Sequence, residues 1–366
     1  MEIVGPDEKY RIYDNDTESE SASSKAYKGC LRHKKLFIIG ISLTLAGLLF
    51  IASYIGPIYI PFSEVLKDIF TLNNTGLGRI VWNVRLVRIF GGILIGAGLA
   101  VSGVVMQCIL KNPLASPYTL GLSSAAAFGA AFSIVFVGTG SMITSAISID
   151  DPFVTTGFAF FFSMIATGVI LLLTKITKVT AETMVLAGIA ISAIFSAGLS
   201  FIQYVATDSQ LANIVSWSFG DLGRATWPWD LFVFAILLPV AVYFIYKRWD
   251  YNAMDAGEET AKGLGINTQR ERIIGMILSS MLCSVIVSFF GIIAFVGLLG
   301  PHIARMIIGG DHRYLIPASM IMGSLILVAA DLLGKQILAP EVIPVGIITS
   351  LLGGPLFIYL LIRRYR

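Results

Sequence analysis

Acidic side chains and glycines are concentrated in one polar stretch of the chain, residues 249–265. Asp255 lies three residues before Glu258, a spacing that predicts a helix N-cap with an acid at the third helical position. Glu258 and Glu259 would then occupy the first turn of a short helix, where the helix dipole favours negative charge. The residue types therefore indicate a short helix that carries negative charge at its start.

Two glycines close the same stretch. Gly263 and Gly265 can end the short helix in a left-handed cap. Because long apolar runs lie on both sides of the stretch, the capped helix would sit beside a membrane, within reach of a soluble partner. An ordinary solvated loop is the alternative interpretation.

Other residue types that carry chemistry are scattered. The three cysteines and three histidines show no metal-ligand spacing and no disulfide framework: Cys30, Cys108, Cys283, His33, His302 and His312. The chain has no Gly-x4-Gly-Lys-Ser/Thr phosphate loop, no His-Glu-x-x-His motif and no nucleophile elbow. We therefore expect no catalytic residue, no metal site and no bound cofactor in this chain, and no nucleic-acid partner.

The composition determines what must position the polar stretch. Of 366 residues, 56% are hydrophobic and only 13% are charged, whereas a soluble domain carries about 25% charged residues. Apolar runs of about 20 residues recur, long enough to cross a bilayer as helices, and they lack the alternation of barrel strands. We expect an all-α polytopic membrane protein, surrounded by lipid, with about ten transmembrane helices: 36–56, 86–109, 117–138, 153–174, 182–206, 228–246, 271–291, 296–308, 314–333 and 345–362.

The first 35 residues are polar and lack apolar periodicity, so we interpret 1–35 as a mobile cytoplasmic tail and 36–366 as the membrane domain. Basic residues before the first span predict a cytoplasmic N-terminus, and ten crossings return the C-terminus to the same side. That arrangement places most cations inside (Lys111, Lys175, Lys178, Lys247, Arg248, Arg313, Arg363, Arg364 and Arg366) and several acids outside (Asp150, Asp151, Asp208 and Asp221). Four cations are exceptions at the outer face: Arg79, Arg85, Arg88 and Lys335.

Three groups of segments, in this order and spacing, resemble the iron-siderophore and vitamin B12 permease family of ABC importers, the FecCD type. They are Arg85–Arg88 with Gly96–Gln107 and Lys111–Gly121; Gly257–Gly265; and Gly297–Arg305 with Gly310–Arg313, Ala330–Asp331, Pro344–Gly346 and Gly354–Pro355. Two departures stand out. The family's Arg-Leu-Pro-Arg reads Arg-Leu-Val-Arg here, which removes a proline kink, and the glutamate near Pro-Val-Gly is displaced to Glu341.

The resemblance implies a vitamin B12 permease-like subunit of ten helices that forms a homodimer in the cell membrane. Two cytoplasmic ABC ATPase subunits, which hold the ATP and Mg²⁺, would drive it, and an extracytoplasmic binding protein would deliver the substrate. The chain itself would be a transport subunit and not an enzyme. The family's coupling segment matches Met254–Gly265, within a segment of about 253–265, which assigns ATPase coupling to Met254, Gly257, Glu258, Glu259, Gly263 and Gly265.

The resemblance also gives the outer cations a function. Arg85 and Arg88 match a basic pair that receives acidic residues of the binding protein, and Lys335 matches a third position. The alternative is that these side chains extend toward lipid head groups.

A turn after the second span provides a third group of candidates. Gln107, Asn112 and Pro113 would shape the inner mouth of the translocation path, or else simply end a helix. The function that follows is inward transport of a metal chelate: a ferric siderophore, haem or a corrinoid. A molybdate or tungstate importer of the same fold is the alternative, and an ion-coupled secondary transporter centred on Asp331 is a further one.

Overall fold

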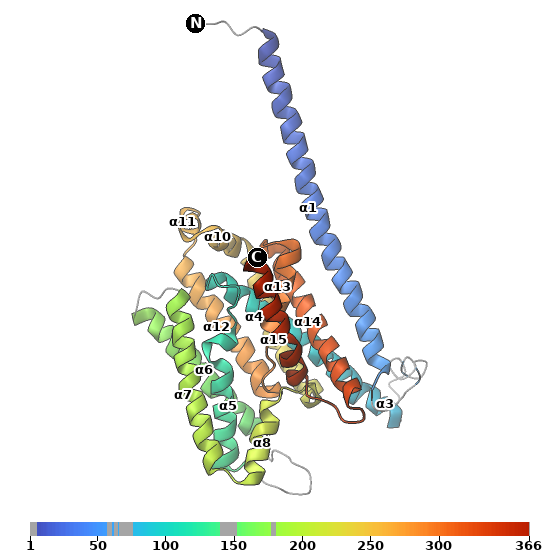
Figure 1. Ribbon diagram of the computed structural model, residues 1–366, viewed down its shortest axis with the longest axis vertical. Helices are drawn as coiled ribbons and strands as arrows, with labels where there is room; N and C mark the ends of the chain where they lie inside the picture. Colours follow the sequence, from blue (N-terminus) through green and yellow to red (C-terminus); the bar gives the residue numbers. More distant parts are fainter. Residues whose placement is uncertain are drawn as a thin grey trace.

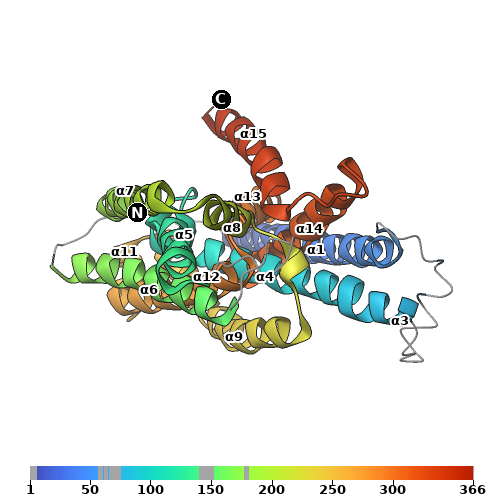
Figure 2. The same ribbon diagram turned by 90° about the horizontal axis from the view of Figure 1, so that it is seen from below.

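The computed structural model describes residues 6–56, 61, 65, 76–139, 152–176 and 181–365, and those residues are almost entirely helical (Figures 1 and 2). In chain order the helices are α1 (Pro6–Tyr54), α3 (Gly76–Ile80), η1 (Val81–Leu86), α4 (Val87–Ile109), η2 (Pro117–Leu120), α5 (Leu122–Phe132), η3 (Ser133–Val137), α6 (Pro152–Ile176), α7 (Ala181–Val205), α8 (Asp208–Ser218), η4 (Leu222–Arg224), α9 (Trp227–Tyr246), α10 (Arg248–Ala256), α11 (Glu258–Gly263), α12 (Thr268–Phe290), α13 (Val296–Ile308), α14 (His312–Ile337) and α15 (Val345–Tyr365). Within the described residues, β-pairing is limited to an isolated bridge between Phe219 and Ile292. The all-helical fold is confirmed.

The ten predicted spans all correspond to apolar helices. Seven helices are long and apolar enough to cross a membrane, and three shorter apolar helices cover 122–137, 296–308 and 345–359. The short eighth span, α13, is shielded by neighbouring helices, since its residues from Val296 to His302 are buried.

Helix α4 forms the centre of the bundle. The apolar helical stretch 78–109, which includes α4, has 83% of the residues in its most apolar part buried. The corresponding share in α7 is 17%. Helix α4 packs against α9, α12, α13 and α14, and Figure 2 shows α15 projecting from one side of this group. An apolar helix that is buried all round is the expected core element of a membrane bundle.

Glycines bring α4 into backbone contact with two neighbours. A Cβ on Gly103 would overlap the carbonyl oxygen of Gly297 in α13, and a Cβ on Gly96 would collide with the backbone of Gly323 in α14. Small residues allow helices in a membrane to approach this closely. These contacts fix α13 and α14 against the central helix.

The first helix differs from the sequence expectation. Residues 6–35, interpreted as a mobile tail, continue the helix of the first span, so that α1 runs from Pro6 to Tyr54 and projects well beyond the bundle (Figure 1). Extending an existing helix needs no new nucleus, which is the costly step of helix formation. Polar residues can therefore prolong a span that apolar residues begin.

The second span also begins earlier than predicted, with α3 and a π-helical turn, η1, before α4. Arg85 lies in that turn, and Val87, which stands in place of the family's proline, continues the helix as the first residue of α4.

The two ends of the bundle carry different elements. The projecting part of α1, the segment α10–α11 and the C-terminus lie at one end, and α3 and α8 lie at the other (Figure 1). Of the charged residues placed by topology, Lys178, Asp150, Asp151 and Arg366 lie outside the described residues.

Candidate coupling segment and its ion-pair networks

The polar stretch forms two helices and not one. Helix α10 ends at Ala256, and Gly257, with φ 136° and ψ 151°, begins α11 without a side-chain cap. The prediction that Asp255 caps the short helix is therefore wrong, since Asp255 lies in the last turn of α10. The break requires glycine, because residues with a Cβ rarely adopt this positive φ.

The predicted left-handed cap is confirmed at the other end of α11. Gly265 has φ 80°. Its N–H donates to the Lys262 carbonyl at 2.9 Å, and the Ile266 N–H donates to the Ala261 carbonyl at 3.0 Å. These two bonds form a Schellman motif, whereas Gly263 is the last residue of the helix itself.

Helix α11 presents charge to the outside. Glu258 and Glu259 lie in its first turn, and the Glu259 side chain is 92% exposed. Arg272 of α12 contacts Glu258 at 3.5 Å, and Lys262 does so at 3.4 Å. Desolvation raises the pKa of Glu258, but the two cations outweigh it and the net shift is downward. The carboxylate is therefore ionised at neutral pH.

Helix α10, in contrast, is held firmly against the bundle. Met254 and Tyr251 are 2% and 0% exposed. The Tyr251 ring lies against Phe244 and His312, and the guanidinium of Arg313 lies 4.6 Å from the ring of Trp249. The predicted coupling residues thus divide into a buried base at Met254 and an exposed tip in α11.

Asp311, the N-cap of α14, joins three helices. It accepts a hydrogen bond from the Arg313 N–H and forms an ion pair with the Arg313 guanidinium at 2.7 Å. It also contacts Lys34 of α1 at 3.3 Å and accepts from Asn252 of α10 at 3.1 Å. Burial raises the pKa of Asp311, but hydrogen bonds from Arg313 and Asn252 outweigh it and hold the pKa well below its usual range.

One group of potential metal ligands lies beneath α10. Atoms of Cys108, Asp255 and His312 lie within 4.8 Å of one another. Each already has a protein partner: Cys108 Sγ donates to the Tyr251 carbonyl, Asp255 Oδ2 pairs with Arg305 at 3.1 Å, and His312 Nδ1 lies 3.1 Å from Asn252 Oδ1. Because Arg305 already balances the charge of Asp255, we interpret the group as a polar contact between helices.

The three outer cations assigned to binding-protein docking, Arg85, Arg88 and Lys335, are less than 10% exposed. Arg88 lies between Asp331, at 2.7 Å, and Asp221, at 3.3 Å. Lys335 pairs with the other oxygen of Asp331 at 2.7 Å. Arg85 donates to the carbonyls of two residues at the end of α1, Ser53 and Tyr54, both at 2.9 Å. These cations make contacts within the chain, which neither the docking nor the lipid interpretation anticipated.

The turn after α4 has the geometry of a helix stop. Lys111 has φ 47°, the Asn112 N–H donates to the Gln107 carbonyl at 3.1 Å, and Asn112 Oδ1 accepts from the Leu114 N–H at 2.9 Å. Gln107 is 3% exposed, and its side chain donates to the Leu298 carbonyl at 3.4 Å. Asn112 and Pro113 are half-buried. A role of these residues in a path stays a prediction.

Sequence reasoning missed Asn252, Arg305 and Asp311 as members of one site. An aspartate directly before an apolar helix is an N-cap signal, so the capping by Asp311 was predictable. Its contacts with α1 and α10 were not, because they join positions more than 50 residues apart.

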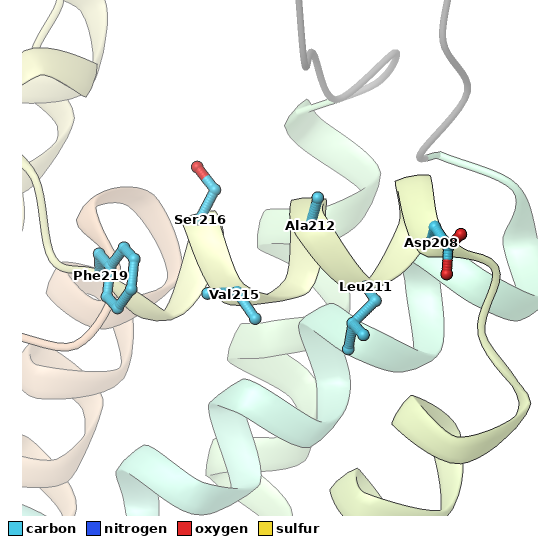
Figure 3. Close-up of a pocket in the computed structure, with 6 residues that line it drawn as sticks. All are labelled: Asp208, Leu211, Ala212, Val215, Ser216 and Phe219. Carbon is cyan, nitrogen blue, oxygen red and sulfur yellow. The ribbon is translucent and has the colours of Figure 1, made fainter.

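An open groove of about 470 Å³ runs along α8, at the end of the bundle opposite α10 (Figure 3). One face of this helix lines it at helical spacing: Asp208, Leu211, Ala212, Val215, Ser216 and Phe219. The groove is mostly apolar and carries no cluster of catalytic groups.

Comparison with known proteins identifies consistent relatives. A model described as the FecCD transport family matches residues 41–363. A protein of Methanocaldococcus jannaschii named as an ABC transporter permease is 49% identical over 338 residues, 91% of this chain and 96% of the relative. The hemin transport system permease protein HmuU of Yersinia pestis is 35% identical over 298 residues, 80% of this chain and 87% of the relative.

A solved structure has the same fold. It is described as an inward-facing conformation of a metal-chelate type ABC transporter, with a TM-score of 0.76 and 28% identity. The match covers 89% of this chain and 98% of that chain.

Proposed function

Because the chain belongs to the FecCD transport family, as its three groups of segments indicated, we propose that it is the membrane permease subunit of a binding-protein-dependent ABC importer. Its substrate is a metal chelate or a related compound, such as a ferric siderophore, haem or a corrinoid. A separate ATPase holds ATP and Mg²⁺ and drives inward transport, so the chain itself has no hydrolytic site.

The observation that carries this proposal is the construction of α10–α11. An exposed, capped helix with two acids in its first turn projects from a base that is buried in the bundle. A soluble partner can bind the exposed helix α11, and a movement of α11 would be passed to α10, which is packed in the bundle. We assign docking of the ATPase to Glu258, Glu259, Gly263 and Gly265, with Gly257 setting the direction of α11 and Met254 anchoring it.

The same proposal sets the stoichiometry and orientation. An ATPase dimer that closes on two nucleotides needs one docking site for each subunit. Each permease chain offers one α10–α11 segment, so a homodimer supplies both sites. The end with α10–α11 is cytoplasmic, together with both termini. Lys111, Lys247 and Arg313 belong to that end, which agrees with the excess of cations on the inner side of membrane proteins.

The external binding protein docks at the opposite end, where Arg85, Arg88 and Lys335 lie. Arg88 and Lys335 pair with Asp221 and Asp331, and Arg85 holds the end of α1, which indicates how they contribute. Together they hold α1, α4, α14 and the loop before η4 in the shape that the partner meets.

An ion-coupled secondary transporter is less well supported. Such a protein needs an acid that gains and loses a cation, and Asp331 was the candidate. Both of its carboxylate oxygens pair with protein cations at 2.7 Å, which leaves a structural function as the better explanation. An oxyanion importer of the same fold remains the alternative substrate class.

Reconstitution tests the proposal. The permease and its partner ATPase are placed in liposomes, and ATP hydrolysis is measured with the binding protein either empty or loaded with ferric siderophore, haem, corrinoid or molybdate. Stimulation by one loaded form supports the importer and identifies its substrate. Failure to assemble with an ATPase, together with uptake driven by an ion gradient, would reject it.

A further inference from the structure

The first N–H groups of a helix have no partner inside that helix. In α14 the side chain of Asp311 accepts from Arg313, and the N–H of His312 donates to Asn252 Oδ1 at 2.7 Å. Asn252 belongs to α10, and its amide also donates to Asp311 at 3.1 Å. The start of α14 is therefore capped jointly by its own aspartate and by a residue 60 positions earlier in the chain.

A second link joins α10 to α13. Asp255 Oδ2 lies 3.1 Å from the Arg305 guanidinium and 3.8 Å from His312 Nδ1. Gly310 lies beside this pair, and a Cβ there would be in ordinary contact with Arg305 at 3.4 Å. Both side chains are partly open to solvent, with the carboxylate 27% and the guanidinium 28% exposed.

We propose that these residues, Asn252, Asp255, Arg305, Asp311 and His312, form a rigid junction that transfers the movement of α10 to α13 and α14. We call them the α10–α14 junction. This inference rests on the proposed function and adds to it, because docking of the ATPase on α11 and transmission of its motion become tasks of separate residues. Helices α13 and α14 both touch α4 backbone to backbone, so a displacement passed through the junction reaches the centre of the bundle.

Two variants that each remove one contact of the junction separate transmission from docking. Arg305→Gln and Asn252→Ala should lower substrate-stimulated ATP hydrolysis about tenfold, a typical size for coupling between sites, while the ATPase still copurifies with the permease. Arg248→Gln is the matched control. It neutralises the arginine at the start of α10, whose guanidinium donates to the nearby Ile245 carbonyl at the end of α9.

The outcomes distinguish the two levels of the argument. If the wild-type complex shows no stimulated hydrolysis, the proposed function fails. If the wild type is stimulated and both junction variants are stimulated equally well, the junction inference fails. The pair Asp255→Asn with Arg305→Gln should be no worse than Arg305→Gln alone, because the two groups act as one unit.

If a junction variant does not fold, the inference can still be tested by measuring distances in a protein whose five junction residues are unchanged. Spin labels are placed at Ala256→Cys of α10 and Ile307→Cys of α13, after Cys30→Ser removes the exposed cysteine. The separation within a chain should stay the same with and without bound ATP, while the separation between the Ala256 labels of the two protomers changes. A change in the distance within the chain would overturn the rigid junction.

Discussion

Arg88 shows how a single buried cation can organise one end of a membrane bundle. It lies between the carboxylates of Asp331 and Asp221, and Lys335 supplies a second positive charge. Removing one member of such a group leaves an uncompensated charge in a poorly solvated place, which costs more than the pair contributes when intact.

Arg88→Gln should therefore destabilise the chain by about 3 kcal/mol. The measurement is thermal unfolding in detergent, compared with Arg270→Gln, a change at an exposed position on α12. Adding Asp331→Asn to Arg88→Gln should recover part of the loss. Equal unfolding temperatures for Arg88→Gln and the wild type would show that the network is not structural.

The acids of α11 act at the same scale but face outward. Replacing Glu258 and Glu259 with lysine should abolish ATP hydrolysis coupled to transport. The ATPase surface that fits the acidic start of wild-type α11 would be repelled by the positive charge of the variant. The permease dimer should remain folded, as size-exclusion chromatography would show. Unchanged coupling in this double variant would remove the assignment of docking to α11.

At the scale of elements, the direction of α11 depends on Gly257. A residue with a Cβ would be strained at φ 136°, at a cost of about 1–3 kcal/mol. Relief of that strain by a continuous helix would turn α11 away from its observed direction.

Gly257→Ala should thus weaken both ATPase binding and coupling, measured by copurification and by stimulated hydrolysis. Gly40→Ala in α1 is the control, since that glycine is helical and has open space around its Cα. Normal binding and coupling in Gly257→Ala would mean that the break between α10 and α11 has no functional importance.

The elements also show what sequence patterns can and cannot predict. Apolar runs predict the seven membrane-length helices and the three shorter apolar helices, because burial in lipid depends on local composition. The cap at Gly265 is equally local. Three features could not be predicted from the pattern of polar and apolar residues, because at each of them more than one backbone conformation fits the local sequence. They are the break at Gly257, the helical continuation of α1 through residues 6–35 and the π turn at Val81–Leu86.

The candidate site was predicted only in part, for a related reason. Residues 254–265 could be recognised as one polar segment, but their anchorage to Arg305 and Asp311 arises when distant parts of the chain meet. Similarly, Arg85, Arg88 and Lys335 were recognised as cations in unexpected places, whereas the contacts of Arg88 with Asp221 and Asp331 and of Arg85 with the end of α1 join distant parts of the chain.

At the scale of the whole molecule, one permease chain is half of the proposed transport unit. Native mass spectrometry of the assembled importer should give two copies of this chain for two copies of the ATPase. A complex with a single permease chain that still transports substrate would contradict the homodimer.

The backbone contacts of α4 restrict how this chain can diverge during evolution. Any residue larger than glycine at Gly96 or Gly103 would collide with the main chain of α14 or α13, whereas Gly157 and Gly168 of α6 have nothing within 4 Å of an added Cβ. Substitutions at the two open glycines of α6 therefore carry little steric cost, so related sequences are free to differ there. At Gly96 and Gly103 they can differ only if α14 or α13 moves away from the central helix.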